Sequence, residues 1–149
     1  MGGQVGDTGV LLGEGIRLSV GDTKSHNGLY AHTAQVEEGT LHEGAVLTAS
    51  VDEHRRALIK RNHTATHLLD AALKEVLGNH VNQAGSLVSP EHLRFDFTHF
   101  EGLTTEQLRR VEELVNREIF AAKPVVTRVM GIEDAKASGA VALFGEKYS

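Results

Sequence analysis

Two histidines, His63 and His67, stand four residues apart within a run that reads Asn-His-Thr-Ala-Thr-His. On a helix, side chains at this spacing project from the same face, so that two imidazoles can point at one ligand. Helical zinc sites use this spacing. In zinc proteases of this type a glutamate directly follows the first histidine and acts as the general base. Here Thr64 occupies that position, which excludes such a protease.

The pair alone does not define a metal site, because two histidines at this spacing are more often ordinary surface or packed residues. Two imidazoles also leave a tetrahedral zinc shell half filled. The chain holds nine histidines and no cysteine among its 149 residues, so that a disulfide or a thiolate ligand from this chain is excluded. The other seven match no ligand spacing, and we expect most of them in turns or on the surface: His26, His32, His42, His54, His80, His92 and His99.

Four cations fall within seven residues just before the pair: Arg55, Arg56, Lys60 and Arg61. The formal net charge of the chain is -5, so an overall basic footprint for nucleic acid is absent. The cluster is either a solvated helix face or a local contact to phosphate.

Composition predicts a soluble globular protein of one domain or two small ones, with 23% charged residues and a mean hydropathy of -0.20. No apolar run approaches the ~18 residues that span a bilayer, and no signal peptide is recognisable. We therefore expect a cytoplasmic protein that does not bind membranes.

The elements that would position these residues fall into two groups. Residues 1–51 are rich in glycine, and three short strands are expected at 16–20, 29–36 and 45–51, which indicates a small β-barrel or sandwich. The period changes at Asp52, a plausible N-cap for a long amphipathic helix that ends before Gly78. The predicted fold class is therefore α+β: a small N-terminal β-barrel over 1–51, followed over 52–149 by an α+β domain in which the long helix packs on an antiparallel sheet.

Further elements are expected along the second group. Strands are predicted at 81–88 and 92–98, and a helix begins at Thr104 with a capping box to Gln107. The expected apolar stripe of this helix consists of Leu108, Val111, Val115 and Ile119. After it we predict a strand over 125–130, a short helix over 132–137 and an apolar run over 141–144.

Five blocks in order resemble the editing domain of alanyl-tRNA synthetases, and together they cover essentially the whole chain. Arg61–Leu69 is similar to the signature helix of that domain, and the other blocks are Gly2–Gly9, Gln83–Val88, Leu93–Thr98 and Gly139–Tyr148. Editing domains of threonyl-tRNA synthetases share a related helix, but the Gly-Gly-Gln entry at residues 2–4 favours the alanyl type or its freestanding relatives. Residues 2–4 themselves are expected to serve strand and turn geometry.

The resemblance implies a hydrolase that removes wrongly attached serine or glycine from the tRNA for alanine. An aminoacylation pocket rejects a smaller amino acid, or one with an extra hydroxyl, only weakly, so a second site must sort the products. By match, His63 and His67 would bind zinc together with a Cys and a His from a later Cys-x-x-x-His motif. Thr66 and Gln83 would line the catalytic pocket, and the basic cluster would hold tRNA phosphates. The zinc ion would orient the aminoacyl ester or activate a water.

The chain departs from the family pattern because it ends before that Cys-x-x-x-His motif and lacks the synthetase core. We therefore expect a truncated fragment with weak zinc binding, little hydrolysis and a tendency to self-associate through an unpaired sheet edge. Two other hypotheses remain open. One is a non-catalytic module that binds tRNA or a partner chain, and the other is a freestanding trans-editing deacylase.

Overall fold

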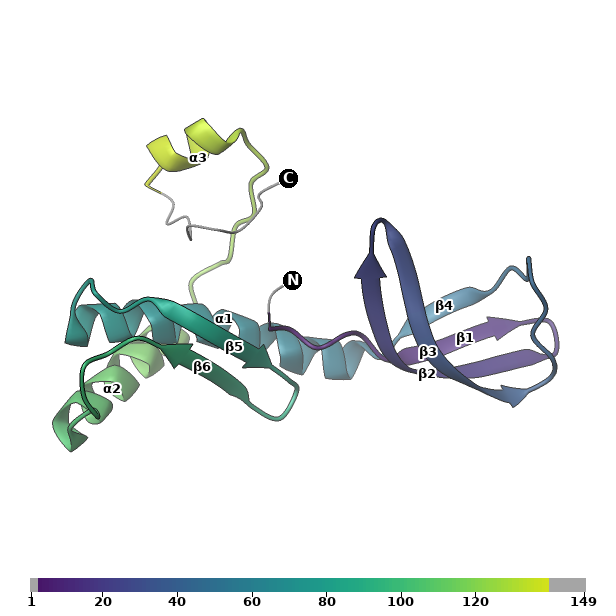
Figure 1. The fold of residues 1–149 in the computed structure, drawn as a ribbon, viewed down its shortest axis with the longest axis horizontal. Coiled ribbons are helices and arrows are strands. Elements are labelled where there is room, and N and C mark those ends of the chain that lie inside the picture. Colours follow the sequence, from purple (N-terminus) through teal and green to yellow (C-terminus); the bar gives the residue numbers. More distant parts are fainter. Residues whose placement is uncertain (1–2, 140–149) are drawn as a thin grey trace.

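In the computed structural model, which describes residues 3–139, a four-stranded antiparallel sheet stands at one end of a long helix, and a two-stranded antiparallel sheet lies alongside that helix (Figure 1). The long helix is α1 (Glu53–Leu77). Gly2, the expected apolar run over 141–144 and all but the first residue of the block Gly139–Tyr148 lie outside the described residues.

The four-stranded sheet at the N-terminal end has the order β3-β2-β1-β4, and all its neighbours are antiparallel. Its strands are β1 (Gly9–Gly13), β2 (Ile16–His26), β3 (Leu29–Glu38) and β4 (Thr48–Val51). Asn27 and Gly28 join β2 to β3 with φ angles of 49° and 80°, as a tight hairpin with two positive φ values requires.

The predicted small barrel is not confirmed, because this sheet is open. β3 and β4 are its two edges, and closure would require them to pair with each other. A pattern of short strands and turns does not specify whether the outer strands meet. Among the described residues β6 (Leu93–Phe97) also has an unpaired edge, so β3, β4 and β6 each offer an edge at which the expected self-association could occur.

Helix α1 begins and ends where the sequence predicts. The Asp52 carboxylate accepts a hydrogen bond from the Arg55 backbone N–H at 2.9 Å, and Gly78 forms the C-cap with a φ of 112°. No described helix is both long enough and apolar enough to cross a membrane.

The second unit packs α1 against a two-stranded sheet and a second helix. β5 (Gln83–Val88) pairs with β6, and α2 (Thr105–Ala121) begins with the expected capping box between Thr104 and Gln107. The core is formed by side chains from α1, the loop after it and α2: Ala72, Leu73, Val81, Val111 and Leu114. The apolar faces of the two helices thus bury each other, and partly buried Phe95 and Phe97 of β6 complete the cluster.

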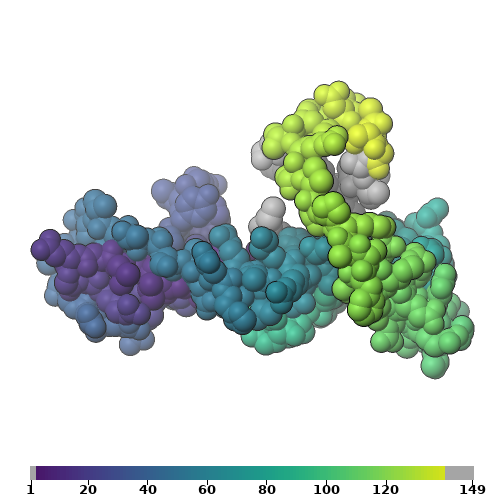
Figure 2. Space-filling view, turned by 180° about the vertical axis from the view of Figure 1, so that it is seen from behind, coloured from purple at the N-terminus to yellow at the C-terminus, as the bar shows by residue number. Residues whose placement is uncertain are grey.

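Two expectations for the C-terminal part are wrong. Leu108 and Ile119 of the expected stripe on α2 are 55% and 51% exposed, and Leu114 is buried instead. The strand expected at 125–130 is not formed, although the short helix α3 (Ile132–Ala137) is. Val125 and Val129 remain 80% and 100% exposed, since no strand within residues 3–139 runs beside this β-prone segment. In Figure 2 the segment after α2 projects away from the body of the molecule.

The core contact between the two helices predicts a large difference between two identical substitutions. Leu73→Ala, at a side chain that is 2% exposed, should lower the free energy of unfolding by about 2–5 kcal/mol through lost burial and a residual cavity. Leu108→Ala should change it by no more than about 0.5 kcal/mol. Urea denaturation of both variants measures this, and equal losses would contradict the described packing of α2.

Candidate functional site

The histidine pair lies on one face of α1, as the spacing predicts. The His63 and His67 rings are stacked with their centroids 5.3 Å apart and their planes 14° from parallel. His63 is half-buried and His67 is exposed. The Nδ1 atom of His63 lies 2.6 Å from Oε1 of Gln4, a residue 59 positions earlier in the chain.

Gln4 belongs to a segment that we call the N-terminal strap, residues 3–8. The strap lies along β5: the Val88 N–H donates to the Gly3 carbonyl at 2.7 Å, and the Val5 N–H donates to the Val88 carbonyl at 3.1 Å. Gly3 has a φ of 78° and lies so close to Ser86 that a Cβ would overlap the serine hydroxyl. The strap therefore needs glycine at position 3. Because Gly3 lies so close to Ser86, the next residue, Gln4, is within reach of His63.

The environment of His63 favours its neutral form. Burial lowers the pKa of His63 below its ordinary 6.5, and repulsion from the neighbouring His67 imidazolium lowers it further. Between this lowered pKa and 6.5 the unfolded chain binds more protons at this position than the folded chain. The stability that the neutral His63 ring contributes is therefore fully present above pH 6.5. It is lost as the pH falls from 6.5 through the lowered pKa of the folded chain.

The two residues expected to line the catalytic pocket differ in exposure. Thr66 is 7% exposed, and its hydroxyl donates to the Asn62 carbonyl at 2.8 Å, one turn earlier in α1. Gln83 is exposed at the start of β5, where its Nε2 donates to the Ser86 hydroxyl at 3.3 Å. Among residues 3–139 no hydrogen bond joins Thr66 or Gln83 to either histidine. Gln83 and Gly3 nevertheless both contact Ser86, which brings Gln83 beside the strap that holds His63.

The four expected phosphate contacts have two different environments. The Arg55 guanidinium donates to the Gly6 carbonyl at 2.8 Å, and the Arg56 guanidinium pairs with the Asp7 carboxylate at 2.8 Å. Both arginines therefore hold the strap. Lys60 and Arg61 are exposed and form no ion pair with any of the described residues.

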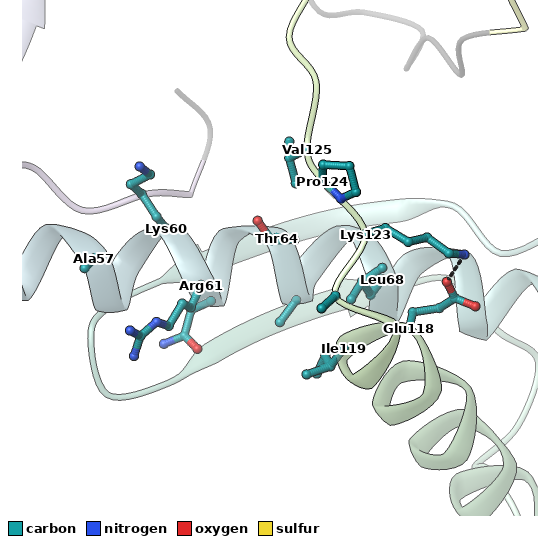
Figure 3. Close-up of a pocket in the computed structure, with 13 residues that line it drawn as sticks. Ala57, Lys60, Arg61, Thr64, Leu68, Glu118, Ile119, Lys123, Pro124 and Val125 are labelled. Carbon is teal, nitrogen blue, oxygen red and sulfur yellow. Dashed lines mark hydrogen bonds and ion pairs between the residues drawn. The ribbon is translucent and has the colours of Figure 1, made fainter.

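Lys60 and Arg61 line one end of a groove of about 740 Å³ between α1 and the C-terminal end of α2 (Figure 3). At the other end the Lys123 ammonium and the Glu118 carboxylate form an ion pair of 2.5 Å. Between these ends the walls are mainly apolar and include Leu68, Ile119, Pro124 and Val125. Within the part of the chain that the structure describes, an anionic ligand in this groove would therefore meet unpaired positive charge at the Lys60 end.

Three contacts were not predicted from the sequence. Gln4 was expected to serve only strand and turn geometry, and the glycine at position 3 is the one sequence feature that could have signalled the close approach. Asn62 ties α1 to the β5–β6 turn by donating to the Ser89 carbonyl at 2.8 Å. His80 and His99, expected to be incidental, share a hydrogen bond of 2.8 Å, for which their 19-residue separation gives no signal.

A metal ion at the pair would find two donors among the described residues. His63 and His67 offer one imidazole each, and no group of three or more His, Cys, Asp or Glu side chains within residues 3–139 is arranged to hold a metal. The fit is therefore partial: the donor type suits zinc, and the remaining ligands would have to come from outside the described residues.

Comparison with curated proteins finds relatives along almost the whole chain. An alanine–tRNA ligase of Alkaliphilus oremlandii is 57% identical over 149 residues. Those of Acetivibrio thermocellus and Sinorhizobium medicae are each 54% identical over 148 residues. Each match covers 99% of this chain but only 17% of the relative's length. No protein-family profile matches the chain.

The repulsion between the paired imidazoles predicts a change in the pKa of His63. In His67→Gln the neighbouring positive charge is gone, so this pKa should rise towards 6.5 without reaching it, because burial remains the larger cause. An NMR pH titration of the His63 ring measures this. His54→Gln, at an exposed histidine of the same helix, is the control and should leave the His63 titration unchanged. The same upward movement in both variants would show that the pair does not interact as described.

Proposed function

Because the chain belongs to the alanine–tRNA ligase family, as the homologue of one segment of these enzymes, we propose that it is their editing region. It would hydrolyse tRNA for alanine that carries serine or glycine, in the cytoplasm, as part of a longer synthetase. The ligation of alanine to tRNA is the activity named for the relatives, and this segment spans 17% of their length. We assign it the proofreading step rather than the ligation. The observation that carries the proposal is the stacked pair of histidines, of which His63 contacts the strap, within a sequence of this family.

Zinc is the metal that this donor set suits. His63 and His67 would provide two ligands, and the rest would come from the Cys-x-x-x-His motif of the family. When bound, the ion would polarise the ester carbonyl or lower the pKa of a water that attacks it. The lowered pKa of His63 supports this use, because only a neutral imidazole has the lone pair that binds a metal.

Thr66 and Gln83 would recognise the amino acid of the substrate. The Thr66 hydroxyl gives its proton to the Asn62 carbonyl, so towards a substrate it can only accept a hydrogen bond. The Gln83 amide uses one of its two N–H bonds on the Ser86 hydroxyl, and its carbonyl oxygen remains available as an acceptor. Two acceptors suit the ammonium group of a seryl or glycyl ester and the hydroxyl of serine.

Lys60 and Arg61 would be the tRNA contacts of the basic cluster. They are exposed and unpaired among the described residues, whereas Arg55 and Arg56 are engaged with the strap. A phosphate beside Lys60 and Arg61 would meet two positive charges without breaking an existing ion pair.

Deacylation assays test the editing proposal. We compare this chain with a version extended through the Cys-x-x-x-His motif of a relative, using seryl- and glycyl-tRNA for alanine with added zinc. The extended protein should hydrolyse both, the short chain should be at least about tenfold slower because its zinc shell is incomplete, and His63→Ala in the extended protein should abolish the rate. His54→Ala is the matched control and should retain it.

Two outcomes would contradict the editing proposal or its metal. Equal rates for the short and extended proteins would exclude a required ligand outside this chain. Binding of tRNA that persists without any hydrolysis in the extended protein would support the alternative of a non-catalytic tRNA-binding module.

The salt dependence of tRNA binding tests whether Lys60 and Arg61 are the residues of the basic cluster that contact phosphate. Each lost phosphate contact reduces the slope of log K against log salt concentration by about 0.7–0.9. Lys60→Ala/Arg61→Ala should therefore reduce the slope by about 1.4–1.8 and weaken binding equally for tRNAs of different sequence. Lys24→Ala, at an exposed lysine of β2 that already pairs with Asp22 at 3.3 Å, is the control. An unchanged slope in the double variant would exclude the groove end as a phosphate contact.

A further inference from the structure

We propose that Gln4 is a positioning residue that selects the tautomer of the neutral His63 ring. The amide oxygen of Gln4 lies 2.6 Å from Nδ1 of His63, and an amide oxygen can only accept a hydrogen bond. Nδ1 must therefore carry the proton of the neutral ring. The lone pair is then on Nε2, the nitrogen at the far side of the ring from the strap.

This contact can select one tautomer because the strap is itself immobilised. Its residues are held on one side by β5, through the hydrogen bonds of Gly3 and Val5 with Val88. They are held on the other side by Arg55 and Arg56 of α1, which bind Gly6 and Asp7. The segment around Gln4 is thus anchored from both directions by contacts that do not involve the Gln4 side chain, and its amide reaches His63 from a fixed position.

The two histidines of the pair are consequently unequal. His67 is exposed, and no hydrogen bond to its ring is formed by any of the residues from 3 to 139, so its tautomer is left to the solvent. His63 presents a single available nitrogen in a fixed orientation. That Nε2 serves as a ligand to the metal rests on the proposed function, whereas the tautomer itself is a property of the metal-free chain.

Two-dimensional NMR of the ring nitrogens in the metal-free 149-residue chain tests the proposal at a pH where His63 is neutral. Long-range couplings between ring protons and nitrogens distinguish an Nδ1–H ring from an Nε2–H ring. The wild-type chain should show His63 as the Nδ1–H form. Gln4→Ala and Gln4→Met, which remove the acceptor, should shift His63 towards the Nε2–H form that histidine prefers in water. Gln4→Glu, which restores an acceptor, should keep Nδ1–H.

Controls separate the tautomer from general damage to the fold. Gln35→Ala, at an exposed glutamine of β3, should leave the His63 pattern unchanged. His80 and His99 fix each other through their own hydrogen bond, so their patterns should be the same in every variant. An Nε2–H ring for His63 in the wild-type chain would overturn the proposal without need of any variant. An unchanged Nδ1–H ring in both Gln4→Ala and Gln4→Met would also overturn it. Neither result depends on deacylation, so failure of the editing proposal is detected separately.

Discussion

The clamp between the N-terminal strap and α1 is the interaction on which the rest of the structure depends. Among the described elements, no strand of the four-stranded sheet makes extensive contact with a helix or with the β5–β6 pair. The strap connects the two units, and Arg55 and Arg56 fasten it to the first turns of α1. The Asp52 N–H adds a hydrogen bond to the Thr8 carbonyl at 2.8 Å. The same few residues thus orient the N-terminal sheet and bring Gln4 to the histidine face.

Because of this clamp, the four cations of the basic cluster have different roles. Four cations in one short run look alike in the sequence, and electrostatic attraction for phosphate would be assigned to all of them. In the structure the Arg56 charge is neutralised by the Asp7 carboxylate of the strap, and the Arg55 guanidinium donates to a strap carbonyl. Lys60 and Arg61 have no such partner among the described residues. The Arg56–Asp7 pair is half exposed, with side-chain exposures of 52% and 26%, so it contributes little stability. Its effect is on orientation, because it sets where the strap lies.

Local rules in the sequence predict local structure well and distant contacts poorly. Asp52, Thr104 and Gly78 mark helix ends because capping involves only neighbours along the chain, and these ends are where the sequence placed them. The predictions of a barrel and of a strand at 125–130 were different, because each depends on a second strand that pairs with the first. A local sequence pattern does not identify that partner. Four-residue spacing predicted the histidine pair, since a helix fixes it. The contact between Gln4 and His63 joins residues 59 positions apart, and only the fold reveals it.

Helical geometry also determines how the histidine face and the groove relate. Successive residues of a helix turn by about 100°, so Thr64 in the groove wall faces well away from His63. Lys60, three residues before His63, returns to within about 60° of it and lies about 4.5 Å away along the axis. Lys60 therefore borders both faces. A substrate whose ester lies at His63 and whose phosphates follow the groove can cross α1 beside Lys60. This makes Lys60, rather than Arg61, the cation closest to the chemistry that we propose.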